Sequence, residues 1–179
     1  MKNILTVLIF ILSYNGIAQE INWISLDKAL ELQKTTPKKI FIDAYTVWCG
    51  PCKMLDRNTF KNKDVIDYIN KNYYAVKFNA QGDEEVTYKG KTYTNPGYNP
   101  AKAKTRNSNH QLSNALGIRA FPTLVFLDED ANLLAPIVGY KDAKGLEMYL
   151  KLFAQNDHLD MKTQEDFDTY AKNFKAEFN

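Results

Sequence analysis

Two cysteines separated by two residues give the clearest indication of chemistry in this sequence. They are Cys49 and Cys52, the only cysteines among 179 residues, and they stand in the segment WCGPCK. A Cys-x-x-Cys pair that opens a helix places the first sulfur beside unpaired backbone N–H groups and the positive end of the helix dipole, which lowers the pKa of its thiol. The second sulfur lies one turn further along the same side. The pair is therefore suited to thiol–disulfide exchange, in which Cys49 attacks a disulfide and Cys52 resolves the mixed disulfide.

Three other roles for the pair stay open on the residues alone. A structural disulfide would close too small a loop to restrain the unfolded chain much. A zinc site needs four ligands, and the only further soft donors are His110 and His158, which have no convincing spacing. A pair of solvent-facing thiolates could also transfer copper. No metal site is predicted, and both histidines are expected to be ordinary loop residues.

An acidic residue precedes the cysteines by six positions. Asp43 lies in KIFIDAY, residues 39–45, an apolar run that is rich in strand-forming residues and predicts a buried strand. In an alternating strand Asp43 points away from the face of Ile42 and Ala44, and it lies near the base of the cysteine helix. Apolar surroundings raise the pKa of a carboxyl group, so Asp43 is a candidate to exchange a proton with Cys52 through a water. The alternative is an exposed acid at the end of the strand.

The elements that position these residues follow from hydrophobic patterning. A helix begins at Cys49 or Gly50, and Pro51 stiffens its first turn, where the missing N–H costs nothing. The other predicted elements are strands at 23–24, 73–79, 123–127 and 133–138, and helices at 26–34, from 64 onward, and at 111–116, 143–154 and 162–176. Pro136 places the strand at 133–138 at a sheet edge or bulge. This order predicts an α/β fold with helices on both faces of the sheet.

Residues 80–110 are polar and less regular than the rest of the chain. They contain three glycines, two prolines and three tyrosines, Tyr88, Tyr93 and Tyr98. Residues 86–94 can form a hairpin about Lys89 and Gly90, and an exposed loop is the alternative.

The first eighteen residues have the pattern of a secretory signal peptide. Lys2 precedes an apolar run at residues 4–12, and the small residues Gly16 and Ala18 precede Gln19. The run is shorter than the roughly 20 residues of a membrane-spanning helix, and an uncleaved anchor or a buried N-terminal strand is the alternative. Cleavage would leave a mature chain, residues 19–179, outside the cytoplasm, where disulfides can form.

Length and charge limit the remaining possibilities. A chain of 179 residues with 45% hydrophobic residues suits one globular domain with a core. Its formal net charge of +2 is too near neutral to indicate nucleic acid or an anionic membrane as a partner. No nucleotide or flavin motif occurs in the sequence, so no cofactor is expected.

At residues 48–53, WCGPCK, the chain resembles the thioredoxin family, and other segments agree with that family in order. Asp43 stands where the family has its buried acid, and residues 75–79, AVKFN, resemble the central strand. Residues 117–126, GIRAFPTLVF, resemble the segment that holds the family's cis-proline, and residues 138–150 resemble the closing strand, glycine and last helix. The resemblance covers residues 37–154. It implies a thioredoxin fold, in which helices flank a central mixed β-sheet.

The resemblance also implies roles for individual residues. Cys49, Cys52, Asp43 and Lys77 would form the catalytic group, with Lys77 close to the buried acid. The substrate-binding residues would be Trp48, Gly50, Pro51, Phe121, Pro122 and Gly139. Pro122 would be a cis-proline against the cysteine pair, and the backbone of Phe121 would stay free to pair with an extended substrate strand. Trp48 would flank the site, and Gly50 and Gly139 would leave room for a partner.

The chain departs from the family at three places, and these departures suggest a narrower set of partners. Tyr45 stands where cytosolic thioredoxins usually have tryptophan, residues 80–110 are an insertion, and the helix at 162–176 is an addition. One hypothesis is that the tyrosine-bearing insertion helps to choose the partner. The alternative is a loop without such a role.

The dipeptide between the cysteines indicates a direction of reaction. Gly50-Pro51 resembles the reducing members of the family, so the predicted function is a periplasmic thiol:disulfide oxidoreductase that reduces disulfides of selected client proteins. A membrane disulfide reductase is the expected electron donor. The alternatives are a disulfide oxidase or isomerase, and a copper-delivery or non-redox binding module.

Overall fold

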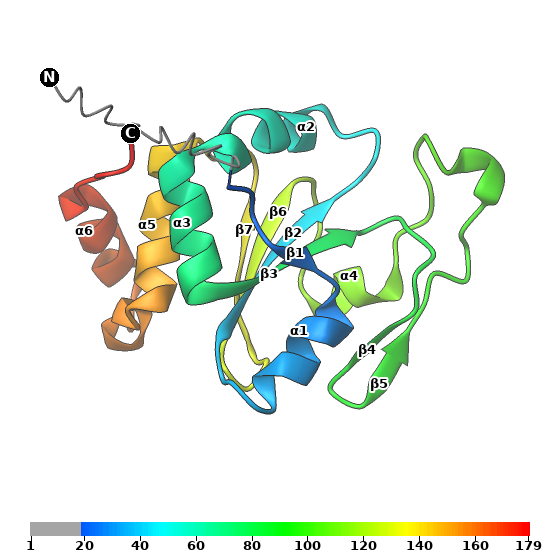
Figure 1. Ribbon diagram of the computed structural model, residues 1–179, viewed down its shortest axis with the longest axis horizontal. Helices are drawn as coiled ribbons and strands as arrows, with labels where there is room; N and C mark the ends of the chain where they lie inside the picture. The colour runs from blue at the N-terminus through cyan, green and yellow to red at the C-terminus, as the bar shows by residue number, and fades with distance from the viewer. Residues whose placement is uncertain (1–18) are drawn as a thin grey trace, which may run out of the picture.

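A five-stranded mixed β-sheet forms the centre of the protein (Figure 1). The structure is a computed structural model that describes residues 19–179, and the predicted signal peptide, residues 1–18, lies outside the described residues. The strands are β1 (Trp23–Ile24), β2 (Lys39–Tyr45), β3 (Tyr73–Asn79), β6 (Thr123–Leu127) and β7 (Leu133–Val138), in the order β1-β3-β2-β6-β7. β3 is parallel to both β1 and β2, whereas β6 is antiparallel to β2 and β7. This topology confirms the predicted mixed sheet.

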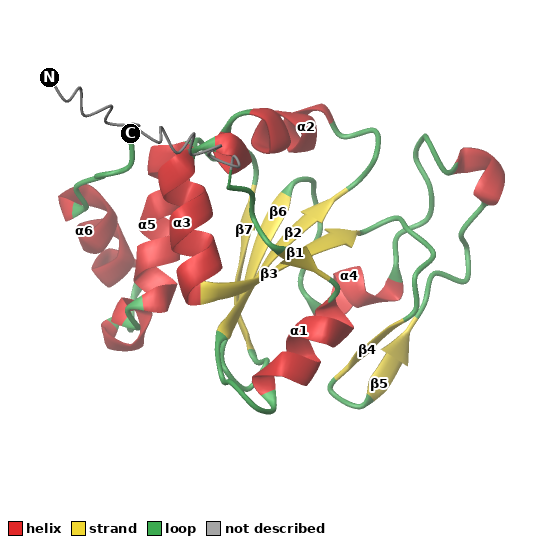
Figure 2. Cartoon of the chain, in the orientation of Figure 1, coloured by secondary structure: helices red, strands yellow, loops and turns green. Residues whose placement is uncertain are grey.

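Helices cover both faces of the sheet (Figure 2). They are α1 (Leu26–Gln33), α2 (Gly50–Arg57), α3 (Lys63–Asn72), α4 (Gln111–Ala115), α5 (Ala143–Ala154) and α6 (Gln164–Asn173), with 3-10 turns at Thr59–Lys61, Pro100–Lys102 and Asp157–Asp160. α3 and α5 pack on one face, and α1 and α4 pack on the other. None of the helices between residues 19 and 179 combines the length and apolar character needed to cross a membrane.

The alternation of side chains along β2 separates two buried clusters. Ile40, Ile42 and Ala44 pack with residues of α1 and α4, whereas Phe41 packs with residues of α3 and α5. Successive side chains in a strand point to opposite faces. Asp43 therefore shares the face of Phe41, at the end of the strand that leads into α2.

The segment at residues 80–110 contains the predicted hairpin rather than an exposed loop. Its strands β4 (Val86–Tyr88) and β5 (Lys91–Tyr93) pair antiparallel, and both turn residues, Lys89 and Gly90, have positive φ. Two such residues in a two-residue loop match the twist of a hairpin. The Tyr88 hydroxyl donates to the carbonyl of Ala131 at 2.8 Å, and its ring is buried in the cluster below α1. This tyrosine therefore anchors the hairpin and is not available to a partner.

The last helix is shorter than predicted. α6 begins at Gln164 because Thr163 and Asp166 form a capping box, and it ends at Asn173 instead of residue 176. The chain then becomes extended at Phe174, and Phe178 is buried near α3 and α5. The burial of this phenylalanine favours a tail that folds back over one that continues the helix.

Candidate active site

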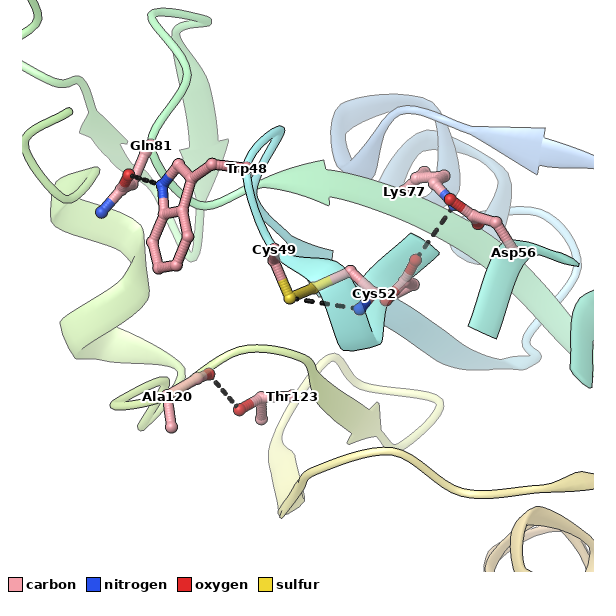
Figure 3. Close-up of a disulfide and its surroundings, with 9 residues drawn as sticks. Trp48, Cys49, Cys52, Asp56, Lys77, Gln81, Ala120 and Thr123 are labelled. Atoms are coloured by element: carbon pink, nitrogen blue, oxygen red, sulfur yellow. Dashed lines mark hydrogen bonds and ion pairs between the residues drawn. A yellow bond between two sulfur atoms is a disulfide. The ribbon is translucent and has the colours of Figure 1, made fainter. Parts of the chain in front are cut away.

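The two cysteines form a disulfide at the N-terminus of α2 (Figure 3). Cys49 is the N-cap residue, and its Sγ accepts a hydrogen bond from the backbone N–H of Cys52 at 3.2 Å. Pro51 stands in the first turn, as predicted. After reduction the same N–H would stabilise a thiolate on Cys49, because the first N–H groups of a helix have no partner within the helix.

The sulfurs are accessible over a small area. Each cysteine is 2% exposed, although Cys49 is the N-cap of α2 and Cys52 lies in its first turn. The turn is closed by a hydrogen bond from the N–H of Cys49 to the carbonyl of Thr46 at 3.1 Å. A partner must therefore fit closely against this turn to reach Sγ.

Asp43 is fully buried, which shows that the alternative of an exposed acid is wrong. Its neighbours across the sheet are Lys77 on β3 and Leu124 on β6. The Lys77 Nζ lies 3.1 Å from Asp43 Oδ2 and forms an ion pair with it. The geometry of this pair is not that of a hydrogen bond, and no other group between residues 19 and 179 donates a hydrogen bond to either carboxyl oxygen. Burial raises the pKa of Asp43 to about 6, although the charge of Lys77 opposes the rise.

Lys77 is shared between two carboxylates. Besides Asp43 it pairs with Asp56 on α2, and its ammonium lies over the rings of Trp23, Tyr45 and Phe60 at 5.1, 5.3 and 5.5 Å. Burial disfavours the charged ammonium, but the two carboxylates outweigh it and raise the pKa of Lys77. The sequence analysis missed Asp56. Its position four residues after Cys52, on the same side of the helix, could have indicated it.

The segment before β6 has the predicted cis-proline. The peptide bond from Phe121 to Pro122 is cis, and the Pro122 carbonyl accepts the N–H of Gly139 at 2.8 Å. Thr123 Oγ1 donates to the carbonyl of Ala120 at 2.7 Å, and Figure 3 draws both residues in the surroundings of the disulfide. Gly139 has φ +92°, a conformation that favours glycine for backbone reasons. Room for a partner at Gly139 thus stays a prediction.

Trp48 is held between the cis-proline segment and the residues that follow β3. Its ring meets that of Phe121 edge-on, with 6.1 Å between centroids, and its Nε1 donates to Gln81 Oε1 at 2.8 Å. The guanidinium carbon of Arg106 lies 4.4 Å from the centroid of the Trp48 ring. Nothing in the local sequence pattern marks Gln81 or Arg106, because their positions depend on the path of residues 80–110.

His110 is a structural residue, so its assignment as an ordinary loop residue was wrong. It is fully buried as the N-cap of α4, where Nδ1 accepts the N–H of Leu112 and Nε2 donates to the carbonyl of Glu84 at 2.7 Å. Its ring also meets that of Phe78 edge-on at 5.3 Å. Nowhere between residues 19 and 179 do three His, Cys, Asp or Glu side chains cluster so that they could hold a metal ion.

The thioredoxin fold combines a mixed sheet, a cysteine pair at a helix N-terminus and a cis-proline before the next strand. This protein has all three features. Residues 26–154 match the thioredoxin-like domain family, and the chain belongs to this family. Family membership and the Cys49–Cys52 disulfide support thiol:disulfide oxidoreductase activity.

Three solved structures show the same fold. A thioredoxin-fold protein from Helicobacter pylori is 18% identical, with a TM-score of 0.59, and the match covers 89% of this chain and 91% of that one. A DsbH oxidoreductase is 17% identical, with a TM-score of 0.52 and coverage of 84% and 95%. A putative disulphide-isomerase from Bacteroides thetaiotaomicron is 28% identical, with a TM-score of 0.53 and coverage of 75% and 93%. No curated protein sequence matches the chain.

Proposed function

We propose that this chain is a periplasmic thiol:disulfide oxidoreductase that reduces disulfides of selected client proteins. The observation that carries the proposal is the geometry at the start of α2. A disulfide there receives a helix N–H on Cys49 Sγ. On the strand that leads into the helix lies the buried Asp43 carboxyl, whose one ion-pair partner among residues 19–179 is the Lys77 ammonium at 3.1 Å. The first feature favours a thiolate on Cys49, and the second supplies a group that can hold or release a proton near neutral pH.

The exchange proceeds in two steps that balance in electrons and protons. The Cys49 thiolate attacks one sulfur of the client disulfide, so that a Cys49–client disulfide forms and the other client sulfur leaves as a thiolate. The Cys52 thiolate then attacks Cys49 Sγ, so that the Cys49–Cys52 disulfide forms and the first client sulfur leaves. The client gains the two electrons that the protein loses. One of its two protons comes from the Cys52 thiol, and the other comes from solvent, which took up the Cys49 proton when that thiol ionised.

Asp43 is the proton acceptor for Cys52 in the second step. With a pKa of about 6, its carboxyl is mostly ionised at pH 7 and can accept the Cys52 proton through a water. The proton can then pass to the departing client thiolate. Lys77 lowers the free energy needed to ionise the buried Asp43 carboxyl, because its ammonium is the nearest opposite charge.

A client segment would lie along the cis-proline segment and beside Trp48, whose ring packs against Phe121. Phe121 and Pro122 would present backbone groups to an extended client strand, and Gly139 would border it. A Cβ atom added to Gly50 would meet nothing within 4 Å, which supports an open approach over the first turn of α2 next to Pro51. The roles of these substrate-binding residues are part of the proposal.

The direction, compartment and electron donor are further parts of the proposal. The Gly50-Pro51 dipeptide supports a reductant, and the signal-peptide pattern at residues 1–18 supports export to the periplasm. A membrane disulfide reductase would then return the disulfide to the dithiol state. The functional domain would be residues 19–179, with a core at 37–154, an insertion at 80–110 and the final helix as an addition.

A redox titration of Cys49–Cys52 tests the direction. A potential near −270 mV, about that of thioredoxin, is expected for a reductant, whereas a potential near −120 mV, about that of a strong oxidant, would contradict it. Trapping tests the exchange itself. A Cys52→Ala variant should accumulate mixed disulfides with client proteins in the periplasm, and a Cys49→Ala variant, the matched control, should accumulate none.

Disulfide isomerase activity is a second candidate, favoured by the relative from Bacteroides thetaiotaomicron that is described as a putative disulphide-isomerase. An isomerase reshuffles a wrongly paired client without net change in its own redox state. Refolding of a scrambled disulfide protein distinguishes the two, because a reductase releases reduced client and an isomerase restores the native pairing. Recovery of native protein by catalytic amounts of this chain would favour the isomerase.

A further inference from the structure

The part of the chain that borders Trp48 and the cis-proline is basic and contains no acidic residue. Residues 86–127 include six lysines and arginines and no aspartate or glutamate. The six are Lys89, Lys91, Lys102, Lys104, Arg106 and Arg119. Lys89 belongs to the hairpin turn and binds Asn132 close to Asp128, whereas Arg106 contacts Trp48, so the charge that this stretch is seen to bring to the site is that of Arg106.

Arg106 is the basic residue of this stretch that contacts the site. Its guanidinium lies over the ring of Trp48, whose own position is fixed by Gln81 and Phe121. The side chain is exposed, and no carboxylate between residues 19 and 179 forms an ion pair with it. Its charge is thus available to a bound partner next to the disulfide.

The loop that presents Arg106 is braced by side chains and has a defined path. Asn107 and Asn99 exchange two hydrogen bonds, and the N–H of Asn107 donates to the same Gln81 oxygen that binds Trp48. The buried Asn95 amide donates to the carbonyls of Gly82 and Ser108. Because the residue after Arg106 is fixed to the partner of Trp48, the guanidinium and the indole form one unit.

We propose that Arg106 is a specificity-determining residue that favours client disulfides flanked by acidic residues. This inference rests on the proposed function and names the client chemistry for the same site. The ring of Trp48 covers one face of the guanidinium, and its N–H edges remain free to bind a carboxylate in a bidentate manner. A client strand that runs along Phe121 past Trp48 would place the neighbours of its cysteine beside these edges.

Exchange with matched peptides tests the proposal. The probes are homodimers of a cysteine hexapeptide, joined by the cysteine disulfide, in which the two residues beside cysteine are both Asp or both Asn. Pre-reduced full-length protein supplies the electrons, and released peptide thiol is quantified by chromatography after acid quenching. We expect a second-order rate constant about threefold to fivefold higher for the Asp peptide, as one or two exposed ion pairs can provide. The preference should decrease with added salt.

Three variants make the test specific. Arg106→Gln should bring the ratio of the two rate constants to about one. Arg106→Lys, which keeps the charge but not the bidentate geometry, should give a ratio between those of wild type and Arg106→Gln. Lys104→Gln removes one charge from the same loop without a contact to Trp48 and should keep the wild-type ratio.

The outcomes separate this inference from the proposed function. An equal ratio in Arg106→Gln and wild type would overturn the role of Arg106 while leaving the exchange activity intact. A loss of preference in Lys104→Gln as large as that in Arg106→Gln would also overturn it, because the general field of the loop would then explain the selection. If the wild-type protein exchanged with neither peptide and not with hydroxyethyl disulfide, the proposed function would fail and this inference with it.

Discussion

The C-terminal tail and the strand before the disulfide each bury a carboxylate, and the two carboxylates differ in their hydrogen bonds. Below the C-terminal tail, Glu147 on α5 accepts the backbone N–H groups of Glu177 and Phe178 at 2.9–3.0 Å and pairs with Lys151 at 2.7 Å. Below the disulfide, Asp43 accepts no hydrogen bond from residues 19–179 and shares its single cation with Asp56. Both carboxylates are 0% exposed.

The contrast shows that the hydrogen bonds of a buried carboxylate, and not its burial alone, decide what it does. A buried carboxylate whose oxygens accept hydrogen bonds stabilises the local structure. A buried carboxyl without donors pays a desolvation penalty when it ionises, so its proton affinity rises toward the pH at which thiols exchange. Glu147 therefore stabilises the tail, whereas Asp43 has the environment that its proposed role in proton transfer requires.

The first prediction, with the largest change, concerns the stability that Glu147 provides by holding the C-terminal tail. Glu147→Gln leaves Lys151 with only the exposed Glu177 as a charged partner, and it replaces the carboxylate that binds the N–H groups of Glu177 and Phe178 by a neutral amide. The free energy of unfolding should therefore fall by about 3 to 5 kcal/mol. Denaturant unfolding at pH 7 measures it. The rate of disulfide exchange by the folded variant should match that of wild type. A slower exchange in this variant would contradict the purely structural role of Glu147.

The second prediction concerns the pH dependence of stability below the disulfide. The pKa of Asp43 is higher in the folded protein, about 6, than the ordinary 3.8, so the folded state holds the proton more tightly. Its contribution to stability is therefore complete below pH 4 and is lost as the pH rises to about 6. Relative to Asp43→Asn, the oxidised wild type should lose about 3 kcal/mol of unfolding free energy over this window.

Denaturant unfolding of both proteins from pH 3.5 to 7.5 measures that difference. Asp67→Asn, which removes a carboxyl at the surface that is paired with Lys63, is the matched control and should follow wild type. A constant difference between wild type and Asp43→Asn at all pH values would contradict the interpretation.

The third effect is on the exchange step. Asp43→Asn should slow the resolution of the mixed disulfide by Cys52 at pH 7 by about a hundredfold, because no positioned base accepts the thiol proton. Quenched-flow measurement of peptide release from a preformed Cys49–peptide disulfide isolates this step. The attack of Cys49 on a disulfide should change much less. An equal loss in both steps would indicate a general distortion of the site instead.

The smallest expected effect comes from Asp56. Asp56→Asn leaves Lys77 to Asp43 alone and removes the repulsion of a second carboxylate, so the pH midpoint of Asp43-dependent exchange should shift below about 6. The pH profile of mixed-disulfide resolution measures the shift, again with Asp67→Asn as the control. An upward shift would contradict this interpretation, because it would mean that Asp56 acts mainly by holding Lys77 next to Asp43.

Much of the fold could be predicted because it depends on local patterns. β2, β3, β6 and α5 have the predicted bounds, since each is an apolar run or stripe ended by turn or capping residues. Asp43 could be located because the pleat alternates and because a motif follows the strand. The end of α6 could not, since it depends on contacts that the tail makes with Glu147 and with the core more than twenty residues away in sequence.

The residues of the site also include some that local patterns predict and others that depend on the path of the chain. Cys49, Cys52, Asp43 and Lys77 were found from the motif and its family resemblance, and the structure brings the acid and the lysine within 3.1 Å of each other. Arg106 and Gln81 reach the site through a braced loop of about 30 residues, a length at which local patterns lose meaning. His110 was misjudged because its role as a buried N-cap depends on the carbonyl of Glu84, on the far side of the hairpin.

Asp43, on the strand that leads into the cysteine helix, holds its proton up to a pH of about 6. The most direct measurement is an NMR titration of its side-chain carboxyl carbon in the oxidised protein, assigned by comparison with Asp43→Asn. The account predicts a midpoint of about 6. A midpoint at or below about 4, the ordinary value of a solvated aspartate, would contradict it.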